Sequence, residues 1–163
     1  MADLTPLDEK LGEVLGLAQA AQDATKKVGA MEGAEDFESD LERMRTQAAE
    51  TERRTDELVD GLDGKKTAIR DKASETKSEA TEMMKTYLGG EEEALDGFEF
   101  LTMAEAGEVG HWSIVGKMNE RAGDARVREL VDWALPIQQR HFQDVLDGSL
   151  NLAADEDPNE TED

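Results

Sequence analysis

The stretch Phe98–Val115, FEFLTMAEAGEVGHWSIV, has the periodicity of a core helix but carries acidic residues where apolar side chains are expected. Its large apolar residues recur every three or four positions, which is the spacing of one helix face. These residues are Phe98, Leu101, Trp112 and Val115. Glu105 and Glu108 fall on the same face. Because burying an unpaired carboxylate costs several kcal/mol, this face predicts either a polar network or a cation at the centre of the fold.

Similar periodic faces occur along the rest of the chain and indicate an all-α fold. They cover residues 7–28, 37–62 and 127–148, and the quoted stretch belongs to a helix expected over 94–122. A weaker stripe between 65 and 88 consists of Ile69, Ala73, Thr76, Ala80, Met83 and Tyr87. Strands are not expected, because period-two alternation is absent and aromatic residues make up only 4% of the chain.

Glycine-containing turns divide these segments into two helical hairpins. Short turns are expected at Gly29–Gly33 and at Gly123-Asp124, so the helices on either side of each turn should pack antiparallel. The segment 65–88 then connects one hairpin to the other. This order predicts a ferritin-like four-helix bundle, with two antiparallel hairpins joined by a crossover helix. A long coiled coil is the structural alternative, but glycine interruptions at intervals of about twenty-five residues argue against it.

One domain is expected over residues 1–150, followed by an acidic C-terminal tail over 151–163. A chain of 163 residues is long enough to build a single hydrophobic core. Six of the last ten residues are acidic, which leaves little apolar surface to bury. The tail is therefore expected to be disordered.

The composition restricts the partners and the location of the protein. Forty acidic residues against eighteen basic ones give a formal charge of -22, which opposes binding to nucleic acid and to anionic membranes. The absence of cysteine excludes disulfides and thiolate metal sites, so any metal must be held by Glu, Asp, Gln or His. No long apolar run or secretory leader is recognised, and a cytoplasmic location is expected. The acidic excess also suits a high-salt cytoplasm, in which charge repulsion is screened.

A second polar pair, Gln138 and His141, occupies core-facing positions of the helix that follows the quoted stretch. Glu108 lies about fifteen residues before the turn at Gly123 and Gln138 the same number after it, so antiparallel packing sets them at the same height. His141 then falls near Glu105. No Lys or Arg occupies a core-facing position of the four main helices. Three partners for the acids remain open: a protonated His141, a proton shared between the carboxylates, or a metal ion.

The sequence Glu108-Val-Gly-His111 adds a Glu-x-x-His motif, which aims a carboxylate and an imidazole at one metal ion from a single helix turn. The metal-free alternative is a hydrogen-bonded network of Glu105, Glu108, Gln138 and His141 that fixes the register of the two helices.

Over residues 5–148 the chain resembles the YciE/YciF-type ferritin-like family of bacterial stress-associated proteins. The resemblance rests on Ala49-Glu50-Thr51-Glu52 with Leu58, on Glu105-x-x-Glu108, on Gly123-Asp124 with Val127 and Leu130, and on Gln138-x-x-His141. It implies a four-helix bundle that holds two metal ions between carboxylates of both hairpins, with iron or manganese as the expected metals.

The chain departs from this family at several ligand positions. Gln19 and Gln22 stand where a carboxylate of the first helix is expected, and Gln47 replaces a histidine of the second helix. Gln138 replaces a glutamate. Because glutamine is a neutral and weak ligand, the resemblance implies a weakened site. The candidate metal ligands are Glu50, Glu105, Glu108, His111, Gln138 and His141.

These observations predict a cytoplasmic, stress-associated ferritin-like protein with a degenerate metal site, forming a homodimer, and they assign no enzymatic activity. The alternative is a metal-free helical bundle that oligomerises or binds a partner through the 65–88 helix. A third hypothesis, based on the long acidic amphipathic helices, is a phasin-like coat on a hydrophobic granule.

Overall fold

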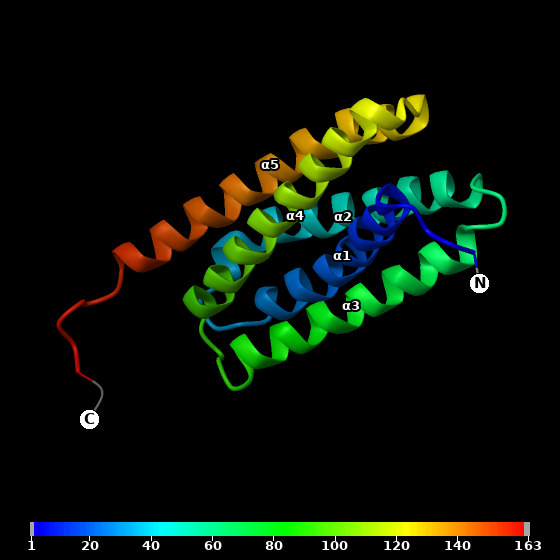
Figure 1. Cartoon of the computed structure of the whole chain (residues 1–163). Helices are drawn as coiled ribbons and strands as arrows, with labels where there is room; N and C mark the ends of the chain where they lie inside the picture. Colours follow the sequence, from blue (N-terminus) through cyan, green and yellow to red (C-terminus); the bar gives the residue numbers. More distant parts are fainter. Residues whose placement is uncertain (1, 162–163) are drawn as a thin grey trace.

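The computed structural model describes residues 2–161, and this part of the chain forms five α-helices (Figure 1). The helices are α1 (Pro6–Gly29), α2 (Glu38–Asp60), α3 (Lys66–Leu88), α4 (Ala94–Ala122) and α5 (Ala125–Ala154), and a 3-10 turn (Glu35–Phe37) precedes α2. No strand occurs in the described residues, and the predicted all-α class is confirmed. None of these helices combines the length and the apolar character needed to cross a membrane.

Helix α1 lies at the centre of the fold, where α2, α3 and α4 pack against it. Helices α4 and α5 run along each other as a hairpin, and α5 also touches α2. Helix α3 packs mainly against α1 and meets α2 and α4 only lightly. Figure 1 shows the consequence, with α3 (green) at one side of the molecule and α5 (orange) at the opposite side.

Local sequence explains where several helices begin and end. Thr5 Oγ1 accepts a hydrogen bond from Asp8 N at 3.1 Å, and Asp8 Oδ2 accepts one from Thr5 N at 2.9 Å, which forms a capping box at the start of α1. Asp8 Oδ2 also accepts from Lys65 Nζ at 2.8 Å, so the cap ties α1 to the start of α3. Helix α4 ends at Gly123, whose φ of 67° favours glycine, and Asp124 caps α5.

The loop between α1 and α2 meets the loop between α3 and α4 at one end of the bundle. Glu32 N donates to Glu92 O at 2.9 Å, and Ala94 N donates to Glu32 O at 2.9 Å. These bonds satisfy backbone groups that neither loop pairs internally. They therefore fix the start of α4 against the end of α1.

The core consists of two apolar clusters separated by a polar layer on α4 and α5. One cluster includes Phe98 and Leu101 of α4, and the other includes Trp112 and Val115 of the same helix. The buried polar residues between them are Glu105, Glu108, Gln138 and His141. The buried face of α4 is therefore apolar towards both ends of the helix and acidic in the middle.

The backbone of α3 approaches that of α1 closely at two glycines. A Cβ atom at Gly16 would lie 2.3 Å from Ala73 O, and one at Gly12 would lie 2.9 Å from Ile69 O. Only glycine permits this contact, which buries Ile69, Ala73 and Thr76 in the first half of α3. Past Thr76, no residue of 77–87 is buried until Leu88 closes the helix against the core.

Helix α5 ends later than the sequence predicts. The acidic tail was expected from residue 151, but the helix continues to Ala154. Leu152 explains the extension, because its side chain packs against the apolar cluster that contains Phe98. Residues 155–161 are exposed.

Candidate functional site

Helices α4 and α5 bring Glu105, Glu108, Gln138 and His141 together in the polar layer. Each of these residues is at most 6% exposed. Gln138 Nε2 donates to Glu108 Oε2 at 2.7 Å and also donates to Glu105 Oε2. Glu108 and Gln138 therefore lie at the same level of the α4–α5 hairpin, as the sequence predicts. A single amide group lies between the two carboxyls, in the place where a shared cation would bind.

His141 links the carboxyl pair to helix α2. Its Nε2 lies 2.6 Å from Gln47 Oε1, and its Nδ1 lies 3.8 Å from Glu105 Oε2. Because Gln47 Oε1 is only an acceptor, this geometry places the imidazole proton on Nε2. Burial lowers the pKa of His141 to about 4, and the charges of Arg43 and Arg140 act in the same direction. The imidazole is therefore neutral near pH 7 and turns a lone pair toward Glu105.

The two carboxyls lack a positive partner. Burial raises the pKa of Glu105 to about 7, against the lowering effect of its hydrogen bonds. Burial also raises the pKa of Glu108 well above its usual range, and the negative charge of Glu105 adds to this effect. Within residues 2–161 neither side chain forms an ion pair with Lys or Arg. Of the three partners considered for the acids, a protonated His141 is disfavoured, and the raised pKa values favour a proton retained by the carboxyl pair near neutral pH in the absence of a metal ion.

Two of the candidate ligands lie away from this pair. His111 Nδ1 is 2.8 Å from Gly107 O, and its Nε2 is 3.4 Å from Glu13 Oε2 on α1. Glu50 lies on the surface of α2, where hydrogen bonds from Arg53 and Arg54 lower its pKa to about 2. In the part of the chain that the structure describes, no group of three or more His, Asp or Glu side chains is positioned to hold a metal ion.

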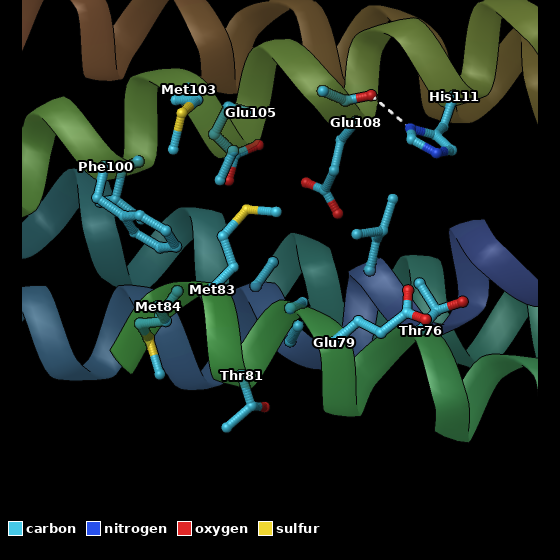
Figure 2. A pocket seen from close by; sticks show the side chains of 18 residues that line it. Thr76, Glu79, Thr81, Met83, Met84, Phe100, Met103, Glu105, Glu108 and His111 are labelled. Atoms are coloured by element: carbon cyan, nitrogen blue, oxygen red, sulfur yellow. Dashed lines mark hydrogen bonds between the residues drawn. The ribbon is translucent and has the colours of Figure 1, made fainter. Parts of the chain in front are cut away.

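A groove of about 270 Å³ lies between α1, α3 and α4, and the carboxyl pair lines it (Figure 2). Figure 2 shows Glu105 and Glu108 reaching from α4 toward α3, with Met83 of α3 reaching toward them. Small side chains of α1 form part of its wall, including Ala20, Ala21 and Ala24. Sequence analysis did not predict this groove. The available signals were the run of alanines on α1 and the weak stripe of α3.

Sequence analysis also missed an ion pair close to His141. Arg43 of α2 binds Asp144 of α5 and Asp40 of its own helix, the latter with Nη1 to Oδ1 at 3.0 Å. This pair joins the two helices one turn from His141, beside the hydrogen bond from His141 to Gln47. The positive charge of Arg43 contributes to the low pKa of His141.

Comparison with protein-family models, with curated proteins and with solved structures finds no match to this chain. Its function must therefore be inferred from the geometry of the site.

Proposed function

We propose that this chain is a ferritin-like bundle of the YciE/YciF type, in which a two-metal site has been reduced to one carboxyl pair that binds a single cation. The order of the helices supports the arrangement, because α3 leads from the α1–α2 hairpin to the α4–α5 hairpin. The burial of Glu105 and Glu108 without a positive partner in the described chain supports the cation site and carries the proposal. The protein acts in the cytoplasm in stress protection, without a redox reaction of its own.

The residues present do not fit a two-metal centre. Such a centre takes carboxylates from both hairpins, but α2 presents Gln47 to the site, and its Glu50 is held at the surface by two arginines. The donors that remain for one ion of iron or manganese would have to move closer together to bind it, because no three of them are positioned for a metal in the described residues. Glu105 and Glu108 would supply carboxylate oxygens and His141 the lone pair of Nδ1. A bound metal would supply the positive charge that the shared proton supplies in its absence.

Gln138 limits the affinity of this site. Its amide N–H donates to both carboxyls, so a cation between them must displace it or turn the amide until Oε1 faces inward. Either movement exchanges hydrogen bonds for metal contacts. We therefore expect weak binding in the wild-type protein, and stronger binding when Gln138→Glu adds a third carboxylate.

Calorimetric titration with Mn²⁺ near pH 8, on protein purified without chelator, tests the proposal. Glu108→Gln and His141→Ala should weaken binding, and Gln138→Glu should strengthen it. Glu99→Gln is the matched control, because Glu99 lies on the same helix and is exposed. Metal that is sub-stoichiometric and unaffected by His141→Ala would refute the cation site.

A metal-free interaction protein is the second candidate, favoured by the apolar residues around the groove. Met83 and Tyr87 of α3 are 52% and 58% exposed, and Met103 of α4 is 40% exposed. Such a cluster favours association of two copies through the α3–α4 face. Sedimentation of the wild type and of Met83→Lys tests it. A wild-type protein that remains monomeric at high concentration would contradict this candidate.

A further inference from the structure

We propose that the groove between α1, α3 and α4 binds a small organic ammonium ion, with its charged head at Glu105 and Glu108 and its apolar body between the helices. This inference rests on the proposed function in one point: both use Glu105 and Glu108 as the group that binds a cation. It adds a class of ligand that a simple metal site does not require.

The size of the groove sets the size of the ligand. A volume of about 270 Å³ holds roughly nine water-sized groups at ~30 Å³ each. This is just below the ~300 Å³ at which ligand pockets commonly begin. A polypeptide helix does not fit such a space, and a bare metal ion leaves most of it empty. A compact molecule with one polar end matches it.

The chemistry of the wall selects the charge of that polar end. Most of the wall is apolar, with Ala21, Ala24, Phe100 and Met103 among its residues. The ionisable side chains that line it are Glu79, Glu105, Glu108 and His111, and no Lys or Arg is among them. An anion would be repelled, and a neutral ligand would leave the buried carboxyls without a positive partner. An ammonium group provides that partner through charge-assisted hydrogen bonds, which are strong in apolar surroundings.

The position of the carboxyls within the groove orients the ligand. Glu105 and Glu108 project from α4 into the space that α3 faces, Met83 lies opposite them, and Met84 and Phe100 lie toward one end of the groove (Figure 2). A ligand with its nitrogen at the carboxyl pair therefore directs its carbon atoms toward these residues. Methionine side chains adapt to ligands of different shape, which favours a class of amines over a single compound.

Phenethylammonium is the probe for the test, and 2-phenylethanol is its uncharged counterpart of the same size. Calorimetry at ~150 mM salt, where long-range attraction to the acidic surface is screened, should detect binding of the ammonium ion at one site. The alcohol should bind about tenfold more weakly or not at all. Glu105→Gln and Glu108→Gln should each weaken binding of the ammonium ion about tenfold. Either variant suffices if the other fails to fold.

Two further variants separate the groove from the carboxyl pair and from surface charge. Ala21→Leu fills the groove while keeping both acids, so it should abolish binding of phenethylammonium and leave Mn²⁺ binding unchanged. Glu99→Gln changes an exposed acid of α4 outside the groove and should have little effect. Equal binding of the ammonium ion and the alcohol would overturn the inference, as would binding that Ala21→Leu does not change. A wild-type protein that binds phenethylammonium but not Mn²⁺ would refute the metal proposal and leave this inference standing.

Discussion

Replacing Glu105 by glutamine should make the protein more stable at alkaline pH, although the residue lies in the core. An acid whose pKa is raised by folding binds its proton more tightly in the folded state. Its contribution to stability is complete below the pKa of the unfolded chain and is lost as the pH rises through the folded pKa. For Glu105 this window runs from 4.5 to about 7. Glutamine has a similar shape and does not titrate.

The raised pKa sets the magnitude of this effect. The difference between 4.5 and about 7 corresponds to ~3 kcal/mol of lost stability once titration is complete. Between about pH 5 and about pH 8 the expected loss is about 2–3 kcal/mol, because the unfolded chain is already partly ionised at the lower pH. Glu105→Gln also removes the charge that helps to raise the pKa of Glu108, which adds to the gain of the variant at high pH.

His141 titrates in the opposite direction and must be separated from Glu105. Its pKa is lowered from 6.5 to about 4, so its contribution is complete above pH 6.5 and is lost as the pH falls through 4. Both proteins contain His141. Its contribution therefore largely cancels when the profile of the variant is subtracted from that of the wild type.

Urea unfolding followed by far-UV circular dichroism, at constant ionic strength and several pH values, measures the difference. The free energy of unfolding of Glu105→Gln should rise relative to the wild type by about 2–3 kcal/mol between about pH 5 and about pH 8. Glu99→Gln on the exposed side of α4 should give a profile parallel to the wild type. A folded Glu105→Gln variant whose profile is also parallel would refute the assignment of a buried, proton-sharing pair.

Three further predictions concern packing and capping, and urea unfolding checks each of them. Gly16→Ala should destabilise the protein by about 1–3 kcal/mol because its methyl group meets the backbone of α3, whereas Gly107→Ala, with open space around its Cβ, should be neutral or stabilising. Thr5→Ala should cost about 1 kcal/mol through loss of the α1 cap, and a smaller change at neutral pH would contradict the capping box. Leu152→Ala should cost about 1 kcal/mol, while Leu150→Ala, which is 61% exposed, should have almost no effect.

Helix positions and the polar layer followed from the sequence because both depend on local rules. The three- and four-residue spacing placed Glu105 and Glu108 on the buried face of α4, and equal distances from Gly123 placed Gln138 opposite Glu108. The Thr5 cap and the turn at Gly123 are also local signals. The all-α class and this pairing therefore required no knowledge of how distant helices pack.

The groove and the position of His111 did not follow from the sequence, because they depend on distances between helices. The contact at Gly16 sets how closely α3 approaches α1, and nothing in the periodicity of α3 shows that Met83 and Tyr87 remain exposed. His111 is spaced from Glu108 like a second metal ligand, yet it turns to Glu13 on α1. A spacing of three residues allows two side chains to share a face, but the partner that each one meets depends on the neighbouring helix, which here supplies Glu13 to His111.

Helix α3 is held most firmly at its two ends. Its first turns are wedged against α1 at Gly12 and Gly16, and Leu88 anchors its last turn. In the turns between, residues 77–87, no side chain is fully buried, although Met84 packs against the Phe98 cluster and Tyr87 meets the ring of Phe100. These turns can bow outward at a fraction of the free energy of global unfolding, so their amide hydrogens should exchange faster than those of α1. If these turns bend outward, the groove that Glu105 and Glu108 line becomes wider while both ends of α3 stay in place.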